Sequence, residues 1–501
     1  MGWFDRLRGV TTASASASSD ALVRTSDQPF KAARRGRASS SFEGTKKHVN
    51  SAIRQGGALL RERSRFLCRE NGLAISSKAL FAAYTVGCGM LPAPIGLNAK
   101  TKQALMKAFY AWCRESGFLS QQKQVAAERF EAGEIFVREI HKAGRSLRLQ
   151  LIASEQLPYS VINPVGMVDG NTVRLGIETN PDDERVAYHF LRYHPGDATV
   201  SAKDRTRTVR VPASEVHHVY WEGQPGQLRG LPETLGALIA ANKLDEYEDA
   251  LIERAISGSK VSGIIKKDPT DRESGSPAMA GAEDNKDGTA TLDFEVGTIL
   301  ELTTGETWET VTPPDPGTNY GEFAYRQQAK ACAAMGVPYL EATGDLRRAP
   351  FSAVRAGRMP FKRRIEQFQH LELVPQLLQP VWEAWLRDGL LRGTITLPRG
   401  AARTVEAYAN VRWMGPKWEY IEPLKDRQAE KLAVDELFVP RSDIIAERGE
   451  DPDEIDQKIA EDQRREKRLK LVRPDTRAPA AAAEPDADDE DDKPDPEDDD
   501  K

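Results

Sequence analysis

Four histidines occur in the middle of the chain, and histidine is the side chain that most often binds metals or moves protons near neutral pH. They are His189, His194, His217 and His218. A metal site needs ligands that converge on one point. His217 and His218 are adjacent in a segment with strand character, so their side chains point to opposite faces of the strand. We therefore interpret the four as packing or loop histidines.

Other patterns that mark catalytic centres are missing from the sequence. It contains no G-x-x-x-x-G-K-[ST] phosphate loop, no G-x-G-x-x-G between a strand and a helix, no G-x-S-x-G and no H-E-x-x-H. No pair of carboxylates lies in an apolar setting that would raise a pKa. We expect no enzyme, no metal and no cofactor. The alternative is a nucleic-acid-processing enzyme such as a nuclease, which would need a convergent metal site.

A basic stretch over residues 347–364 is the strongest charge signal. It holds seven Arg and Lys residues and no acid. Clustered cations of this kind are typical of phosphate contacts that do not read bases. We predict DNA contacts from a loop and from the helix after it; a solvated helix face with salt bridges between subunits is the alternative. The predicted DNA-contact residues are Arg347, Arg348, Arg355, Arg358 and Lys362.

Acidic residues recur at helical spacing in a long amphipathic segment, 232–257. Asp245, Asp249 and Glu253 are four residues apart, which places them on one face of a helix, and Glu248 precedes Asp249. An acidic face repels a polyanion. If copies of the chain stood side by side in a ring, we expect these four residues to line a channel that DNA passes without sticking.

Length and charge set the broad class. A chain of 501 residues exceeds one ordinary core, so two or three domains or one elongated subunit are expected. The segment 484–501 holds 12 acidic residues and two lysines, which makes its charge −10, against −6 for the whole chain. The remaining chain is therefore close to neutral, and the acidic end is predicted to be disordered. No apolar run is long enough to span a bilayer, and the first residues do not resemble a secretion signal.

Four cysteines, Cys68, Cys88, Cys113 and Cys332, show no metal-binding spacing. In a chain of this length they are typical of reduced, mostly buried thiols in a cytosolic protein.

The first half of the chain is predicted to contain helices followed by an antiparallel sheet. Helical spacing covers 46–90, and two further helices are expected over 98–132. Strand patterns separated by turn residues then fill the region 133–222. The predicted strands are 134–140, 145–152, 173–178, 185–193 and 206–211.

The second half is predicted to be mainly helical. A loop rich in Gly, Pro, Asp and Ser covers 266–290, and the first expected helix runs from 319 to 336. Trp382, Trp385, Trp413 and Trp418 are interpreted as core or interface aromatics. The remaining predicted helices are 352–373, 375–391, 424–437, 441–448 and 452–469, and the predicted strands are 289–295, 299–302 and 394–397.

Several separated blocks together resemble the lambda-type family of phage portal proteins, in the order found in that family. They include FEAGEIFVREI at 130–140, GIETNPDDERVAYHFLRYHPGD at 176–197, NYGEFAYRQQAKACAAMGVPYL at 319–340 and the Trp-flanked phrase at 413–456. No single block is specific, but the ordered set is, and it covers residues from about 50 to 465. The acidic end has no counterpart in the family pattern.

The resemblance implies an α+β portal fold with a wing of helices and antiparallel sheet, a two-helix stem, a small α/β clip and a helical crown. The domains it implies are a flexible N-terminal arm 1–45, wing 46–231, stem helix 232–257, clip 258–318, second stem helix 319–337, tunnel loop 338–351, wing and crown helices 352–400, crown 401–470 and a disordered acidic tail 471–501.

The same resemblance implies a function and partners. A portal protein forms a ring, of about twelve subunits, at one capsid vertex, where it is a conduit for double-stranded DNA during packaging and ejection. The implied partners are the terminase large subunit, head-completion or connector proteins and the major capsid protein, without a membrane. The expected location is the virion, after assembly in the host cytoplasm. A tail or adaptor structural protein is a further alternative.

Overall fold

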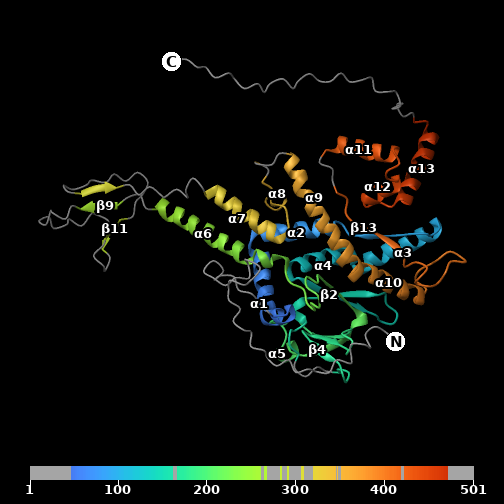
Figure 1. Ribbon diagram of the computed structural model, residues 1–501, viewed down its shortest axis with the longest axis horizontal. Coiled ribbons are helices and arrows are strands. Elements are labelled where there is room, and N and C mark those ends of the chain that lie inside the picture. Colours follow the sequence, from blue (N-terminus) through green and yellow to red (C-terminus); the bar gives the residue numbers. More distant parts are fainter. Residues whose placement is uncertain are drawn as a thin grey trace, which may run out of the picture.

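A computed structural model of the chain describes residues 47–161, 166–260, 264–267, 282–284, 290–292, 306–309, 320–345, 347, 351–418 and 422–471. A body of helices and small sheets carries one long helical projection and, on another side, a group of C-terminal helices (Figure 1). The predicted mixture of helices and antiparallel sheet is confirmed. The arm 1–45, most of the predicted clip, the predicted strand 299–302 and Arg348 lie outside the described residues.

Four helices form the first part of the body: α1 (Val49–Glu70), α2 (Gly72–Val86), α3 (Ala99–Ser116) and α4 (Phe118–Ala132). The helical region predicted over 46–90 is divided at Asn71, which is extended and caps α2 by accepting a hydrogen bond from the Ala74 amide at 2.8 Å. The pair predicted over 98–132 is confirmed, and Gly117 with a φ of 71° makes the turn between its helices.

The predicted antiparallel region consists of two sheets, with strand orders β3-β2-β8 and β4-β5-β6-β7. The strand predicted over 173–178 is a tight hairpin, because Leu175 and Gly176 both have positive φ values, 53° and 83°, and reverse the chain. The strands are β2 (Glu134–Ile140), β3 (Arg148–Ile152), β4 (Thr172–Arg174), β5 (Ile177–Thr179), β6 (Arg185–Leu191), β7 (Thr208–Pro212) and β8 (Val216–Tyr220). The short turns η5 (Ser154–Gln156), α5 (Ala202–Arg205) and η6 (Ala213–Glu215) connect them.

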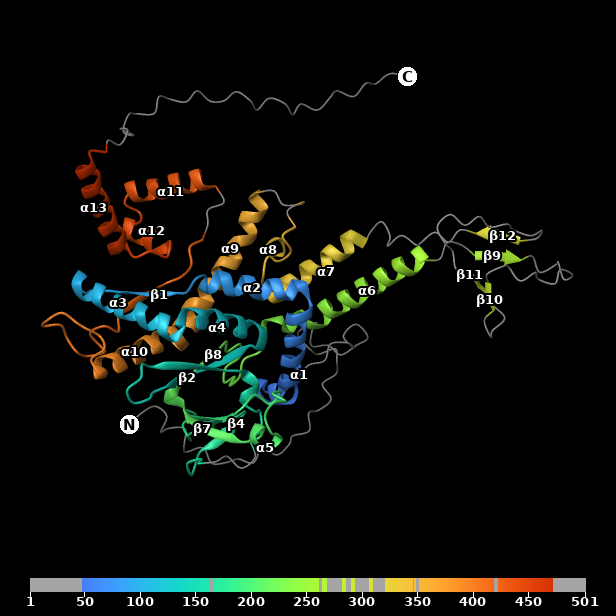
Figure 2. The same cartoon turned by 180° about the vertical axis from the view of Figure 1, so that it is seen from behind.

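Two helices make the projection, which we call the projecting pair: α6 (Leu238–Lys260) and α7 (Tyr320–Met335). They lie side by side and lead away from the body (Figure 2). The helix predicted over 232–257 begins later than expected, because a 3-10 turn, η7 (Glu233–Gly236), precedes it. At the far end, β9 (Ile264–Lys267) pairs with β12 (Glu306–Glu309), and β10 (Ala282–Asp284) pairs with β11 (Ala290–Leu292). The loop predicted over 266–290 therefore contains a strand.

After the short helix α8 (Tyr339–Thr343), one long helical rod crosses the body. It consists of α9 (Phe351–Gln367), the π-helical stretch η8 (Phe368–Leu378) and α10 (Gln379–Arg392). Two helices were predicted here, 352–373 and 375–391, and proline has no amide proton and usually breaks a helix. Pro375 instead lies inside the π-helical stretch, where the Gln379 amide bonds to the Val374 carbonyl, five residues back, so the rod continues.

The strand predicted over 394–397 is wrong. Gly393 ends α10 in a left-handed conformation, and the Thr394 and Ile395 amides both donate to the Gly389 carbonyl. The strand actually formed, β13 (Val411–Met414), pairs with β1 (Leu91–Pro94), more than 300 residues earlier in sequence, with Leu91 opposite Met414. Local periodicity does not reveal a pairing of such long range.

Aromatic side chains fill the core between α3, α4 and the rod. The Phe109 ring lies 5.0 Å from both Trp382 and Trp385, edge-on to each. Trp382 and Trp385 are buried, as is Trp413, while Trp418 stacks on Tyr84 at 4.8 Å. The core interpretation of these tryptophans is therefore confirmed. Cys68, Cys113 and Cys332 are buried free thiols and Cys88 is exposed, as expected for mostly buried cysteines.

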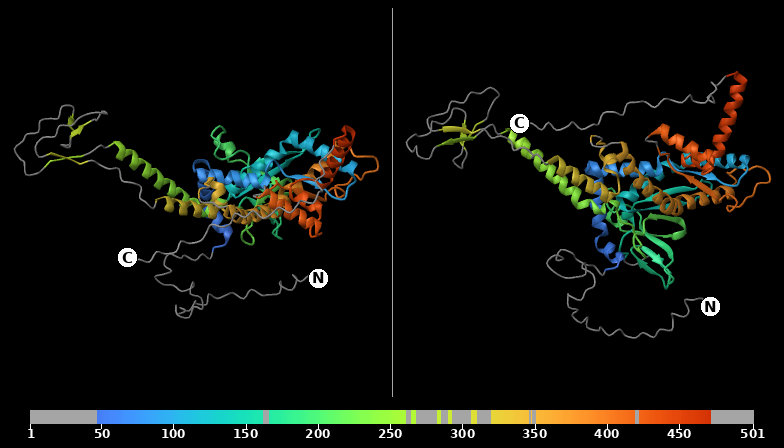
Figure 3. Two further views of the ribbon diagram at one scale, coloured as in Figure 1. Left: turned by 90° about the horizontal axis from the view of Figure 1, so that it is seen from above. Right: turned by 45° about the horizontal axis from the view of Figure 1, so that its top comes forward.

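The C-terminal helices are α11 (Pro423–Asp435), α12 (Arg441–Glu447) and α13 (Pro452–Leu469), close to the predicted bounds. They lie beside α3 (Figure 3), to which Asp451, the N-cap of α13, is joined by an ion pair with Lys102 at 2.7 Å. Neither α11 nor α13 contains a buried residue, and α12 contains Ile445 alone. Among the described helices, none combines the length and the apolar character that a bilayer crossing requires.

Candidate nucleic-acid interface

The four predicted channel acids on α6 do not share one free face. Residues four apart on a helix rotate by about 40° per step, because each residue turns the chain by about 100°. Asp245 accordingly faces the body and accepts hydrogen bonds from Asn71 Nδ2, at 2.8 Å to each oxygen. Glu248 accepts a hydrogen bond from the Tyr320 hydroxyl of α7 at 3.2 Å. Asp249 and Glu253 are exposed.

The projecting pair is held together by aromatic contacts. Tyr247 of α6 meets Phe323 of α7 edge-on, with ring centroids 5.7 Å apart. Apolar surface remains on both helices: Ile239 is 68% exposed, Ile252 56% and Phe323 47%. Singly exposed apolar residues are ordinary, but several along one helical projection are typical of a surface that another chain covers.

The predicted DNA-contact residues are exposed to different degrees, and acids from other elements accompany them. Arg347, 87% exposed, pairs with Asp345 at 2.9 Å. Arg355 pairs with Asp426 of α11 at 3.0 Å, and Arg358 pairs with Glu341 of α8. Lys362 lies 3.7 Å from Glu366. The acid-free stretch of sequence is thus not acid-free in space, because α8 and α11 supply carboxylates to it.

The base of the projecting pair is fixed to the body by a buried ion-pair network. Arg129 of α4, with a side chain 2% exposed, pairs with Glu233 of η7 and Glu372 of η8, both at 2.9 Å. Arg364 of α9 also pairs with Glu233. Burial opposes the charge on Arg129, but the two carboxylates outweigh it and raise its pKa. Burial also raises the pKa of Glu372, against the influence of Arg129. One network therefore joins α4, the start of α6 and the rod.

Sequence reasoning missed Arg129, although a signal was present. Phe118, Gln122, Val125 and Arg129 follow one another at helical spacing on the buried side of α4. A cation in a core-facing stripe must find partners, because a buried unpaired charge is very costly. The stripe could have identified Arg129 as a buried ion-pair residue, but not its partners.

The histidines contact carboxylates. His218 Nε2 lies 3.0 Å from Glu134, which also receives the buried guanidinium of Arg229. On the other face of β8, His217 Nε2 lies 2.8 Å from Glu139. Burial lowers the pKa of His218 to about 4 although Glu134 acts in the opposite direction, so its imidazole is neutral at pH 7. The opposite orientation of the two side chains is confirmed.

His189 is buried beside Glu178 at 3.1 Å, and His194 is on the surface, 3.8 Å from Glu155. Within the part of the chain that the structure describes, no group of His, Cys, Asp and Glu has the arrangement of a metal site. The contacts found for the four histidines are with glutamate carboxylates and, for His218, also with neighbouring aromatic rings.

Comparisons with known proteins place this chain in a family. The sequence pattern of the family described as "Phage portal protein, lambda family" matches residues 35–369, more than half of the chain. A curated protein of Halomonas phage phiHAP-1, described as "Probable portal protein", is 28% identical over 366 residues, covering 71% of this chain and 68% of that protein.

Among solved structures, a chain of the virion of a native gene transfer agent particle is 15% identical, with a TM-score of 0.43, and the match covers 79% of this chain and 94% of that one. A chain of the neck of the native particle, computed with C12 symmetry, is 16% identical with a TM-score of 0.41, covering 82% and 95%. An HK97 family phage portal protein from Corynebacterium diphtheriae is 11% identical with a TM-score of 0.29, covering 66% and 90%.

Proposed function

This chain belongs to the lambda family of phage portal proteins, and from that premise we propose that it forms a closed ring, of about twelve subunits, at one vertex of a phage capsid. Double-stranded DNA would pass through the ring during packaging and ejection. The family match over residues 35–369 is the observation that carries the proposal. The chain would act as a structural conduit, with the energy for translocation supplied by a separate motor.

The exposed apolar residues of the projecting pair support a ring. A ring with rotational symmetry uses two different surfaces of each subunit, one for each neighbour. Ile239 and Ile252 lie on α6, and Phe323 lies on α7, so both helices offer apolar surface. We assign α6 and α7 to the stem. At about 1.5 Å per residue, the 23 residues of α6 extend for about 35 Å, which is long enough to form a channel wall.

The channel lining is proposed to be acidic, but with fewer acidic residues than the sequence indicated. Asp245 and Glu248 make hydrogen bonds to Asn71 and Tyr320, which leaves Asp249 and Glu253 as the exposed acids of that row. Facing a bore, these two would repel phosphates and keep the duplex from binding tightly. Arg347, exposed in the proposed tunnel loop 338–351, would make a loose, sequence-independent contact at one level.

The remaining parts follow the portal plan. The helices and sheets of 46–231 would be the wing, 258–318 at the far end of the stem the clip, and 401–470 the crown, with 352–400 connecting wing and crown. The clip would receive the terminase large subunit and later the head-completion or connector proteins, while the wing would face the major capsid protein. We propose assembly in the host cytoplasm and a final location in the virion.

Electron microscopy of the purified chain tests the proposal directly. We expect annular particles with a central hole of about duplex width, about 20–25 Å, since B-DNA must pass without being gripped. Monomers at every concentration and salt tested would contradict the proposal. Arg347→Ala combined with Arg348→Ala should leave the rings intact and reduce DNA packaging or retention; unchanged packaging would remove the tunnel contact but not the ring.

A further inference from the structure

The turn that joins α11 to α12 exposes two large apolar side chains. Leu437 is 90% exposed and Phe438 is 81% exposed. Backbone hydrogen bonds close this end of α11. The Leu437 amide donates to the Val434 carbonyl at 3.1 Å, and the Phe438 amide donates to the Ala433 carbonyl at 2.9 Å. This is the Schellman pattern that ends many helices. The backbone therefore fixes the shape of the turn, and the two side chains remain available for contact with another molecule.

Leu437 is an unfavourable residue for its place in the turn. Its φ of 62° is left-handed, a conformation that glycine or asparagine usually supplies at a helix end. A leucine there is strained, because its Cβ crowds the backbone. Within its own subunit the exposed side chain offsets little of that strain. An apolar side chain in a strained and exposed position is typical of a surface that another molecule covers.

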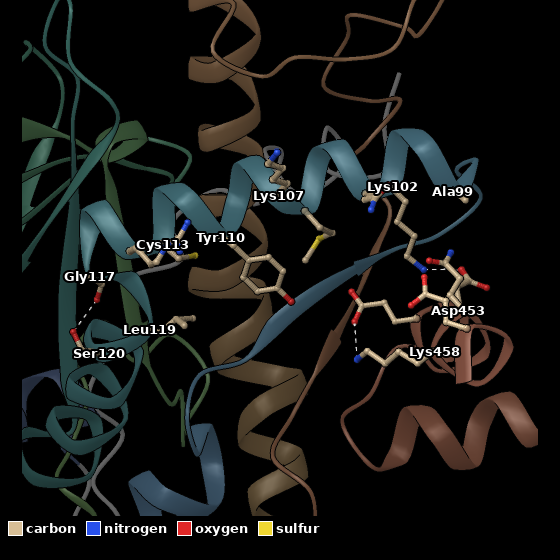
Figure 4. A pocket seen from close by; sticks show the side chains of 16 residues that line it. Ala99, Lys102, Lys107, Tyr110, Cys113, Gly117, Leu119, Ser120, Asp453 and Lys458 are labelled. Atoms are coloured by element: carbon tan, nitrogen blue, oxygen red, sulfur yellow. Dashed lines mark hydrogen bonds and ion pairs between the residues drawn. The ribbon is translucent and has the colours of Figure 1, made fainter. Parts of the chain in front are cut away.

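A groove between α3 and the first turns of α13 has the complementary character (Figure 4). We call it the α3–α13 groove. Its volume is about 900 Å³, enough for two large apolar side chains. Met106, Tyr110 and Leu119 give it apolar walls, and the Tyr110 ring points into it (Figure 4). The exposed turn 435–438 of the same subunit does not fill it.

The charges of the α3–α13 groove that have no partner are mainly positive. Lys107 and Arg114 are exposed, line the groove and lie seven residues apart on one face of α3. Among the described residues, neither has an ion-pair partner. On the α13 side, Glu461 is likewise unpaired in the part of the chain that the structure describes. The other charged residues of that side are paired, Asp453 with Lys102 at 2.6 Å and Glu454 with Lys458 at 3.7 Å.

We propose that the turn 435–438 of one subunit inserts Leu437 and Phe438 into the α3–α13 groove of the neighbouring subunit. Asp435 and Glu436 are exposed and have no ion-pair partner among the described residues, so they face the cations of α3 in this contact. The inference rests on the proposed ring and names the surfaces of one of its contacts. Turn and groove are different surfaces of each subunit, as a ring with rotational symmetry requires.

Exchange of charge tests the contact in the full-length chain. Changing Lys107 and Arg114 to Glu should raise the protein concentration at which half of the chains are in rings by at least about tenfold, because like charges then meet. Changing Asp435 and Glu436 to Lys should have the same effect. The variant with all four changes should return to within about threefold of the unmodified chain, since the opposite charges meet again. Mass photometry over a dilution series measures the assembly.

The matched control for this exchange combines the changes at 435 and 436 with Arg54→Glu and Arg69→Glu in α1, which reverse two exposed cations elsewhere. Assembly should stay weakened in the control. Equal recovery in the control and in the variant with all four changes would overturn the contact, and so would the absence of recovery in both.

A second variant separates the contact from folding. Leu437→Gly relieves the left-handed strain, so thermal unfolding of the unassembled chain should be unchanged or slightly higher in temperature. Combined with Phe438→Ser, it should still weaken ring assembly at least about tenfold, because two apolar side chains are no longer buried. Leu391→Ser, at an apolar position of α10 that is 82% exposed, is the control and should assemble normally. Normal assembly of the double variant would overturn the proposal.

Cross-linking identifies the occupant of the groove. Chains with Phe438→Cys are mixed with chains with Gln103→Cys, since Gln103 is exposed and lines the groove. A disulfide between residues 438 and 103 of different chains, found by mass spectrometry, is the expected result. A disulfide from 103 to another segment, or none in intact rings, would overturn the contact and leave the proposed function in place. If the unmodified chain formed no annular particle, the proposed function itself would fail.

Discussion

Charged residues of the same types have different surroundings in the body and at the end of the last helix, α13. In the body, Arg129, Arg229 and Arg364 lie in networks with carboxylates from distant parts of the sequence. At the end of α13, Arg464 and Lys467 face solvent. Buried charges need partners and are strongly destabilising when one partner is removed, whereas exposed charges contribute little to stability and remain available to a polyanion. The comparison teaches that a basic stretch predicts a phosphate site only when its tertiary neighbours are not acidic.

The largest expected effect is at the base of the projecting pair. Glu233→Gln removes the partner shared by Arg129 and Arg364, so we expect the free energy of unfolding to fall by about 3–5 kcal/mol. Denaturant unfolding of the assembled chain and of the variant would measure this. Arg464→Gln in α13 is the matched control, with an expected change within about 0.5 kcal/mol. Equal losses in the two variants would break the comparison between the body and α13.

The second prediction concerns pH. His218 has a pKa of about 4 in the folded protein, below its ordinary 6.5, because it is buried. The unfolded chain therefore binds one more proton between these values, so stability should fall as pH falls from about 6.5 to 4, by about 3 kcal/mol for this group. In His218→Gln that part of the pH dependence should disappear. If the stability of the variant depended on pH as steeply as that of the unmodified chain, groups other than His218 would cause the loss of stability in acid.

The third prediction concerns the joint between the rod and the C-terminal helices. The Arg355–Asp426 pair is partly exposed, so Asp426→Asn should cost about 0.2–1 kcal/mol, which is too little to unfold the body. Amide exchange should increase across 423–447 and stay unchanged in α1 to α4 and their sheets, because α11 has no buried residues. Unchanged amide exchange across 423–447 would show that Arg355 does not hold the C-terminal helices.

The smallest expected effect on stability is at Arg347. Its side chain is 87% exposed, so Arg347→Ala should leave the melting temperature unchanged. If the proposed contact at Arg347 exists, the same variant should bind duplex DNA more weakly than the unmodified ring. Titration of both with one mixed-sequence duplex measures this, and equal affinities would remove the contact.

Much of the secondary structure was predictable because it depends on local patterns. Apolar spacing located the helices of 98–132 and the C-terminal helices, and alternation located the strand 134–140 at its observed bounds. The predictions failed where contacts between residues far apart in sequence outweigh the local sequence pattern. Two separate helices were predicted over 352–391, but the packed rod continues through Pro375 as a π-helix. The residues 394–397 predicted a strand, but β1 pairs with 411–414 instead.

Exposure of the candidate site could not be predicted in the same way. The spacing of Asp245, Asp249 and Glu253 identified a helix row, but not that Asn71 binds the first of them. The stretch 347–364 was recognised as basic, but Asp426 and Glu341 come from other elements. In the last turns of α13, acids and cations lie close together in sequence, and only the structure shows that Asp462 pairs with Arg465.

The sequence alone determined the class of fold, the ordered blocks of the portal family and the positions of most helices, because helix periodicity and motif order are properties of neighbouring residues. Tertiary structure decided which charges are neutralised. The reason is physical: electrostatic energy depends on distance and burial, and residues such as Arg129 and Glu372 are brought to 2.9 Å from positions far apart in the chain.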